Sequence, residues 1–315
     1  MSQSARNSIG IVIPTFNRGG ILLQTLERLL SLGLCPKEIL IMDQSDKYEP
    51  EQESRLQQLH EKGSIKWHKL PFPSITGAMN QGLMVADSDI VLFLDDDVVP
   101  TEGLLEAHLF AYENSNAACV AGRVVQPWES RHSPVTIESV LQSCEDPDSM
   151  TFNAVGFQAV SRFIGCNFSV DRKIAIEVGG FDMQFSHVAY RFEAEFADRV
   201  LNNGFEIRFF GDAMIEHLHF KSGGTRSFGD AFNTIKPYHS VGRYYYLLVA
   251  NQVPSRISKL ITMPIRSLIT KSNLRRPWKI PMLLIAEIWG LIWAILKSIQ
   301  GRKLIQTTQS EVSDI

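Results

Sequence analysis

Cysteine is scarce in this 315-residue chain, and the few cysteines are scattered. Cys35, Cys119, Cys144 and Cys166 form no CxxC pair, which argues against both a disulfide framework and a structural zinc site. A reducing cytosol is therefore the expected compartment. The first residues also lack a long apolar run before a cleavage site, so no secretory signal is expected.

Acidic residues are almost absent from residues 254–303. This stretch has ten Lys and Arg residues against one acid, Glu287, a balance of +9 in a chain whose total is −3, so the remainder carries −12. An acidic body with a basic, apolar segment indicates an anionic partner, and an anionic membrane surface is the partner we expect. Nucleic acid is not expected, because no zinc-finger or RNA-binding motif accompanies the basic residues.

Short apolar runs alternate with helical patterns through the first hundred residues. The runs cover 9–14, 38–43, 65–70 and 90–94, and the helical patterns cover 21–32, 51–62 and 77–86. This order predicts an α/β fold, a mostly parallel sheet with helices on both faces. Ligands bind beyond the carboxyl ends of such strands. Three runs end in polar residues, at 15–18, 43–46 and 95–97, and we expect these to converge on one crevice.

The pattern changes twice further along the chain. From 117 to 165 three prolines separate short candidate strands, and we expect loops around a continued sheet. Helical patterns return at 172–178 and 189–202, followed by a strand at 205–210. After that the composition favours long helices, so we expect one domain at 1–227 and a helical, basic, membrane-associating region at 228–315.

Apolar residues in the C-terminal region follow helical spacing. A stripe from Ile257 to Ile269 is flanked by basic residues, which is typical of a helix on a membrane surface, and Pro264 predicts a kink in it. The run 280–296 is apolar except for Glu287 and lies at the short end of what spans a bilayer. We favour an interfacial or protein-packed helix over a spanning one, with a core helix of a homodimer as the alternative.

Three carboxylates, Asp95, Asp96 and Asp97, follow the apolar run 90–94. A solvated turn is one interpretation of this position. Adjacent carboxylates repel, however, and Mg²⁺ or Mn²⁺ bound through one or two of them and a diphosphate would relieve that repulsion. We therefore prefer the metal-binding interpretation.

Four ordered motifs resemble the nucleotide-binding half of the family 2 glycosyltransferases. They are IVIPTFNR at 11–18, IMD at 41–43, GAMNQG at 77–82 and FLDDD at 93–97, and the resemblance continues through GGFD at 179–182 to about residue 226. It implies a GT-A fold, a nucleoside-diphosphate sugar as donor, with a UDP-sugar as the first choice, and inversion at the anomeric carbon. Together with the basic tail it implies a glycan or lipid-linked acceptor, as in polysaccharide biosynthesis, at the inner face of the cell membrane.

The resemblance assigns five positions to the donor: Pro14, Thr15, Arg18, Asp43 and Asn80. The first three would line the nucleotide pocket. Asp43 would accept a hydrogen bond from the base, and Asn80 would approach the nucleotide sugar. Without the resemblance, Asp43 would be a turn carboxylate and Asn80 a helix-surface amide.

Asp95 and Asp97 match the family's DxD pair. Asp97 would contact the metal, Asp95 the ribose or the metal shell, and Asp96 would support them. His217 matches a family histidine that follows a strand and would complete the metal shell, and an imidazole ligand suits Mn²⁺ better than Mg²⁺. His219 is the alternative ligand.

A glycine pair follows these histidines. The resemblance indicates that Gly223 and Gly224, with Lys221 and Arg226 on either side, fold over the diphosphate as a lid that adds positive charge. A plain surface loop is the alternative.

Inversion needs a base that removes the proton of the acceptor hydroxyl. In the family this acid begins a helix after the GGFD segment, within an acidic pair. The matching stretch is YRFEAEF at 190–196, which places Glu193 on the base. Phe192 replaces the first acid of the pair, a departure from the family pattern. Glu195 and Asp182 are the rival candidates.

Two other functions fit parts of the sequence. DDDVV at 95–99 matches the DxDx(T/V) pattern of haloacid-dehalogenase-like phosphatases, with Asp95 as nucleophile. Such a nucleophile normally follows the first strand, whereas three strand patterns precede this one. The irregular base motif at Phe192 favours the other alternative, a non-catalytic membrane-associated scaffold.

Overall fold

The first four strands form the parallel half of the sheet. The computed structural model describes residues 8–145, 151–231, 233–250 and 256–306. In it β1 (Ile9–Thr15), β2 (Ile39–Asp43), β3 (Lys66–Lys69) and β4 (Ile90–Leu94) lie in the order β3-β2-β1-β4, all parallel. The three inner strands are nearly continuous buried aliphatic runs, as strands covered on both faces require.

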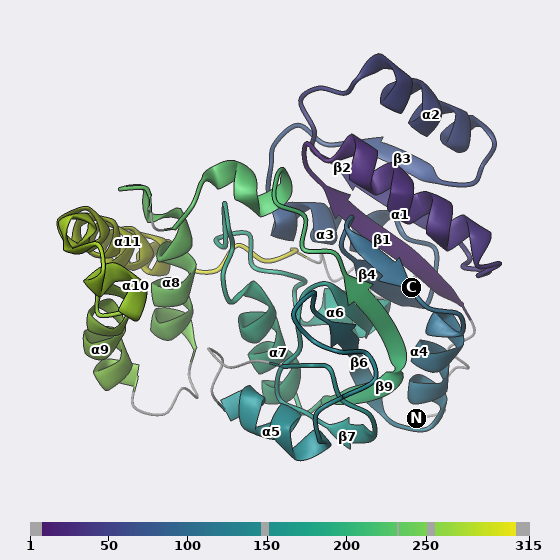
Figure 1. Ribbon diagram of the computed structural model, residues 1–315. Helices are drawn as coiled ribbons and strands as arrows, with labels where there is room; N and C mark the ends of the chain where they lie inside the picture. Colours follow the sequence, from purple (N-terminus) through teal and green to yellow (C-terminus); the bar gives the residue numbers. More distant parts are fainter. Residues whose placement is uncertain (1–7, 146–150, 232, 251–255, 307–315) are drawn as a thin grey trace.

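Helices cover both faces of this half (Figure 1). α1 (Gly19–Ser31) and α2 (Pro50–Glu61) pack together in front of the sheet, and α3 (Ile75–Val85) and α6 (Arg172–Glu177) lie behind it. α3 begins where the Ser74 hydroxyl accepts a hydrogen bond from the Gly77 N–H. The predicted α/β arrangement is confirmed here.

The second half of the sheet is mixed rather than parallel. β8 (Asn167–Asp171) is antiparallel to β4 on one side and to β6 (Ala117–Val125) on the other. β9 (Glu206–His217) is parallel to β6 but antiparallel to β5 (Val98–Pro100) and β7 (Phe157–Ala159). The expectation of a mostly parallel sheet is therefore corrected beyond β4.

Residues 117–165 continue the sheet, as expected, through β6 and β7 with loops and one helix between them. All nine residues of β6 are buried, and the sequence AACVAGRVV lacks the alternation that marks a strand with one solvated face. Three further helices belong to the second half of the sheet domain: α4 (Leu104–Glu113), α5 (Ile137–Glu145) and α7 (Phe192–Asn202).

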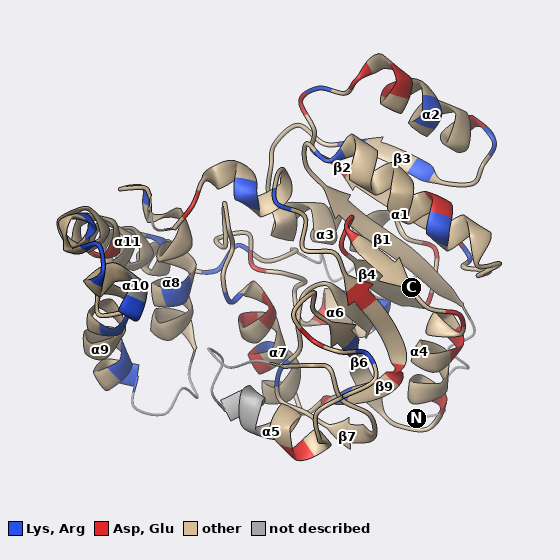
Figure 2. Cartoon of the chain, viewed as in Figure 1, with Lys and Arg blue, Asp and Glu red and all other residues tan. Residues whose placement is uncertain are grey.

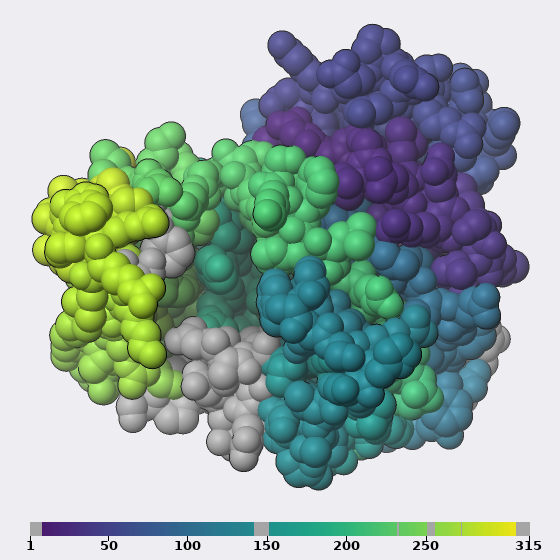
Figure 3. Space-filling model, in the orientation of Figure 1, coloured from purple at the N-terminus to yellow at the C-terminus, as the bar shows by residue number. Residues whose placement is uncertain are grey.

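The C-terminal region forms a helical lobe beside the sheet domain (Figure 3). It comprises α8 (Val241–Val249), α9 (Arg256–Leu268), α10 (Lys271–Leu274) and α11 (Ile280–Gln300). α8 packs between α7 and α11, and its three consecutive tyrosines each donate a hydrogen bond to a carboxylate from another segment. These pairs are Tyr244 with Glu287, Tyr245 with Asp182 and Tyr246 with Asp198.

A short extended segment after α11, residues 301–306, ties the lobe back to the sheet domain, and we call it the C-terminal strap. The Ile305 N–H donates to the Gly179 carbonyl at 2.8 Å, and the Lys303 N–H donates to Asp182 Oδ1 at 2.9 Å. Arg302 Nε lies 2.7 Å from Glu195 Oε1. The division at 227/228 stays a prediction, and these contacts cross it.

The outer faces of the lobe are apolar and basic. Four isoleucines of the α9 stripe, at 257, 261, 265 and 269, are 52–72% exposed, and the helix continues through Pro264. Figure 2 shows Lys and Arg gathered on the same helices. Among the described residues, one helix is long and apolar enough to cross a membrane. It spans Pro277–Gln300, which is α11 with the short turn before it, and 28% of its most apolar 18 residues are buried.

Candidate metal and donor site

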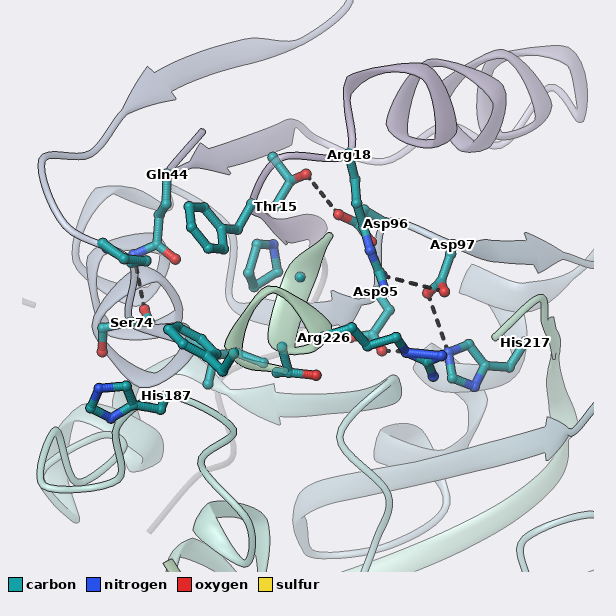
Figure 4. Close-up of a pocket in the computed structure, with 17 residues that line it drawn as sticks. Thr15, Arg18, Gln44, Ser74, Asp95, Asp96, Asp97, His187, His217 and Arg226 are labelled. Atoms are coloured by element: carbon teal, nitrogen blue, oxygen red, sulfur yellow. Dashed lines mark hydrogen bonds and ion pairs between the residues drawn. The ribbon is translucent and has the colours of Figure 1, made fainter. Parts of the chain in front are cut away.

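A pocket of about 130 Å³ lies at the carboxyl ends of β1 and β4 (Figure 4). Two of the three predicted polar endings meet here, and the third contributes Gln44. Most of the predicted site residues line it: Pro14, Thr15, Arg18, Asp95, Asp96, Asp97 and His217. Residues from all three polar strand endings thus meet in one crevice, as expected.

Asp95, Asp97 and His217 form a compact group of possible metal ligands. One ligand atom from each lies within 4.8 Å of the others. His217 Nε2 is 3.2 Å from Asp97 Oδ1 and 3.7 Å from Asp95 Oδ2. Two carboxylate oxygens and an imidazole nitrogen suit a divalent ion such as Mn²⁺. His219 lies outside this group, with its ring against Trp128.

Asp96 also lines the pocket, but its carboxylate is bonded to two residues at the end of β1 and anchors the acidic run. Its Oδ1 is 2.7 Å from Arg18 Nη1, and its Oδ2 accepts a hydrogen bond of 2.7 Å from the Thr15 hydroxyl. Arg18 Nη1 also lies 3.3 Å from Asp97 Oδ2. Asp96 is therefore held by Thr15 and Arg18, whereas Asp95 and Asp97 both face His217.

The charges of this cluster are balanced through His217. Burial acts to raise the pKa of Asp97, but the hydrogen bond from His217 and the Arg18 charge outweigh it and lower that pKa to about 2. Burial acts to lower the pKa of His217, yet Asp97 and Asp95 raise it. Two carboxylates facing one ring nitrogen thus need a positive charge between them. A proton on His217 or a bound cation meets that need.

Gln126, at the end of β6, holds the His217 ring in place. His217 Nδ1 lies 3.1 Å from Gln126 Oε1, so a proton on Nδ1 leaves Nε2 directed at the carboxylates. Metal-binding histidines commonly have such an outer partner. No pattern in the sequence linked Gln126 to His217, because the contact joins segments 91 residues apart.

Four residues of the segment 220–228 line the pocket, namely Gly224, Thr225, Arg226 and Phe228, whereas Lys221 does not, and the lid stays a prediction. The Gly224 N–H donates to the Phe16 carbonyl at 2.7 Å, and Arg226 lines the pocket. Gly223 has φ of 68°, and a Cβ there would meet the Asn17 carbonyl oxygen at 2.6 Å. Only glycine allows this close approach.

Aromatic rings form the wall opposite the carboxylates. Phe16, His187 and Phe228 line the pocket, and the His187 ring stacks on Tyr238 with centroids 3.9 Å apart. The same ring lies 5.5 Å from that of Trp293 on α11. Sequence reasoning gave Phe16 no role although it lies in the motif at 11–18, and it missed His187 and Phe228 because they come from segments without a motif.

The structure does not place Asp43 and Asn80 on the pocket wall. Asp43 is fully buried, and its Oδ2 accepts hydrogen bonds from Trp67 Nε1 and Lys69 Nζ. Asn80 exchanges two hydrogen bonds with the backbone of Phe181. The contacts of both residues are structural, so they do not support the predicted donor roles.

Glu193 lines a second, larger cavity beside the donor pocket. Burial raises the pKa of Glu193. Burial also raises the pKa of Asp95, and the charges of Asp97 and Glu193 add to that rise, so Glu193 lies within electrostatic range of Asp95, one of the possible metal ligands. The rivals are engaged elsewhere: Glu195 pairs with arginines, and Asp182 holds the C-terminal strap.

Comparison with known proteins agrees with this geometry. The family model described as Glycosyl transferase family 2 matches residues 10–184, which is more than half of the chain. The chain belongs to glycosyl transferase family 2. This membership argues against the phosphatase alternative for Asp95.

A curated relative is the pre-mycofactocin glycosyltransferase of Mycobacterium tuberculosis. It is 32% identical over 143 residues, which cover 45% of this chain. The matched segment spans only 29% of that relative's own length. This similarity therefore concerns the matched segment and not the whole of that relative.

Two solved structures share the fold. A mannosyltransferase from Pyrobaculum calidifontis in complex with GDP-mannose and Mn²⁺ has a TM-score of 0.53 at 16% identity, over 93% of this chain and 74% of that one. GalNAc-T7 with UDP, GalNAc and Mn²⁺ has a TM-score of 0.52 at 13% identity, over 84% and 58%. The predicted GT-A fold is confirmed.

Replacing Gln126 with Leu tests the geometry of the metal group. Loss of the Gln126 carbonyl frees the His217 ring, and outer partners of this kind contribute about 10–100-fold to metal affinity. We expect the dissociation constant for Mn²⁺, measured by electron paramagnetic resonance titration, to rise by about that factor. The exposed Gln158→Leu exchange on β7 is the matched control. Equal affinity in both variants would show that Gln126 does not orient a ligand.

Proposed function

We propose that this chain is a metal-dependent inverting glycosyltransferase that moves a sugar from a nucleoside-diphosphate sugar to an acceptor hydroxyl. The observation that carries the proposal is the group formed by Asp95, Asp97 and His217 inside a pocket covered by Arg226. Carboxylates alone would repel a diphosphate, so the site needs a cation to accept one. Family membership supports the same reaction class.

Mn²⁺ or Mg²⁺ would be held by Asp95, Asp97 and His217. When bound, such an ion neutralises the charge that develops on the leaving diphosphate. The imidazole ligand favours Mn²⁺, and both solved relatives contain Mn²⁺. Arg226 on the covering segment adds a second positive charge at the pocket wall.

The nucleotide would lie along the polar end of β1. Pro14, Thr15 and Arg18 line this side of the pocket, and Phe16 and Gln44 offer an aromatic face and an amide. One solved relative contains GDP-mannose and the other UDP. A UDP-sugar is the donor we propose first.

Glu193 is proposed as the base. Its raised pKa makes the carboxylate a better proton acceptor than an ordinary glutamate. It lies in a separate cavity next to the pocket, so an acceptor there would approach the sugar from a side different from the diphosphate. Such an approach is what inversion requires.

Two variants separate the metal site from the base. We expect the wild-type chain with Mn²⁺ to release nucleoside diphosphate slowly from one member of a panel of nucleotide sugars, with water as acceptor. Asp97→Asn should abolish both Mn²⁺ binding and release. Glu193→Gln should keep Mn²⁺ and donor binding but lower the release rate by about 10²–10⁴, the usual contribution of a general base.

The pH profile of release provides the control on Glu193. Because burial raises the pKa of Glu193, the rate should fall with decreasing pH already above the ordinary glutamate value of about 4.3. The exposed Glu177→Gln exchange should change neither rate nor profile. A full rate in Glu193→Gln would remove it as base, and phosphate trapped on Asp95 would establish the phosphatase instead.

The C-terminal lobe is proposed to bind the inner face of the cell membrane, from the cytoplasmic side. One face of α11, with Ala286, Gly290 and Ala294, packs on α8 and on Ser240 before it, while its other face exposes isoleucines, leucines and tryptophan. Lys297 Nζ donates to the Gln184 carbonyl at 2.7 Å, so the end of α11 also stays on the body. A helix held along its length suits interfacial binding better than spanning. A homodimer through this helix stays an alternative prediction.

Polar substitutions on α9 test the membrane proposal without cutting the strap. Ile261→Ser with Ile265→Ser removes two exposed apolar side chains, at 63% and 52% exposure. We expect binding to vesicles with anionic lipid to weaken at least tenfold in flotation assays, because each lost side chain gives up burial in the interface. Leu30→Ser on α1 is the matched control. Unchanged flotation of the double variant would overturn the assignment.

A further inference from the structure

The second cavity has a volume of about 540 Å³ and lies between the start of α7 and the C-terminal lobe. Its wall is built from α7, from the segment that leads into α8, and from α9 and α11. The residues that matter here are Glu193, Arg191, Lys236, Arg243, Leu283 and Glu287. This cavity is about four times the volume of the donor pocket.

We propose that this cavity is the acceptor site and that it takes a phosphate group carried on an apolar chain, with the acceptor hydroxyl presented to Glu193. The proposal rests on the proposed function and adds the chemical class of the acceptor. Three features of the cavity carry it: its place beside the donor pocket, its cationic lining residues, and its apolar lining residues on α11.

The cavity adjoins the donor pocket through one short loop. His187 lines the donor pocket, and Tyr190 and Arg191 line the second cavity. His187, Ala189 and Arg191 all have positive φ, between 53° and 77°, a strained arrangement for residues with side chains and one that clusters at functional sites. The loop is held by α8, where Gly242 lets the Tyr190 carbonyl approach to 2.5 Å from the position of a Cβ. Glu193 follows at once, so the base faces the cavity.

The cavity wall carries donors for an anion. Arg243 Nη2 pairs with Glu287 Oε1 at 2.9 Å, and Tyr244 also donates to Glu287. Arg243 lines the cavity beside Glu287, so this ion pair lies at the cavity wall. Lys236 and Arg191 add two further positive charges, and a phosphate group supplies the oxygens that such donors bind best.

Part of the cavity wall is apolar. Leu283 and Ala286 of α11 form one wall, and Ser267 and Thr270 place the end of α9 at the other. The outer faces of these two helices carry the exposed isoleucines of the lobe. An apolar chain attached to the phosphate would therefore continue from the cavity onto the surface that is proposed to meet the membrane. One acceptor molecule would then place its phosphate in the cavity and its chain on that surface.

Decyl phosphate is a probe that combines an anionic head with an apolar chain. Isothermal titration calorimetry of the full chain, without donor or metal and below the micelle concentration, should show one site. Decanol and inorganic phosphate, which supply the chain and the head separately, should each bind at least tenfold more weakly. Inorganic phosphate binding as tightly would overturn the apolar part, and decanol binding as tightly would overturn the anionic part.

Two substitutions locate the probe. The exposed Lys236→Gln exchange should raise the dissociation constant of decyl phosphate by about tenfold, the usual scale of a charged contact of about 1.4 kcal/mol. Arg243→Gln should do so as well, with its thermal unfolding followed because Glu287 loses a partner. Arg226→Gln in the donor pocket and Lys62→Gln on the far surface should leave binding unchanged. Binding lost in Arg226→Gln, or kept in both cavity variants, would overturn the proposal.

The outcome is separable from that of the proposed function. Decyl phosphate binding requires neither donor nor metal, whereas nucleoside diphosphate release requires both. Release without decyl phosphate binding would overturn the acceptor class and keep the glycosyltransferase. Bound decyl phosphate should also slow that release, because it displaces water near Glu193, and release unaffected by saturating decyl phosphate would overturn the acceptor site.

Discussion

The buried ion pair between Arg18 and Asp96 is the contact on which the site depends. Three consecutive carboxylates that line one pocket repel one another unless positive charge compensates them. The bonds of Asp96 to Arg18 and Thr15 compensate one of the three charges and join the ends of β1 and β4. Arg18 also donates through Nε to the Ser222 carbonyl at 2.8 Å. The Arg18 guanidinium therefore helps to position Asp95 and Asp97, and it also holds the segment 220–228 beside them.

The parts of the site closest to strand ends were predictable from the sequence. Asp95 and Asp97 follow β4, and His217 ends β9. Because strand ends of one sheet meet at one edge, the local pattern and the motif order sufficed to predict that these three side chains lie close together. Asp43 and Asn80 were assigned by the same motifs but bond to Trp67 and Phe181 instead. Those contacts depend on side-chain packing, which spacing along the chain does not encode.

The rest of the site comes from segments without a recognisable pattern. All nine residues of β6 are buried, so its sequence shows no alternation of polar and apolar residues, and nothing in the sequence linked Gln126 at its end to the distant His217. His187 and the loop around it owe their conformation to contacts with Tyr238 and Gly242 in the C-terminal region. That region is therefore a structural part of the site as well as a tail. Its tyrosines and the C-terminal strap bond to acids that the sequence had offered as rival bases, which leaves Glu193 facing the second cavity.

The central claim is that the acidic run and His217 together bind one divalent ion at the donor pocket. Crystals of the full chain grown with Mn²⁺ and a nucleoside diphosphate, measured at the manganese absorption edge, locate that ion directly. One anomalous peak between Asp95, Asp97 and His217 is the predicted result. A peak beside His219 or at a distant acidic surface, with none among these three residues, would contradict the account.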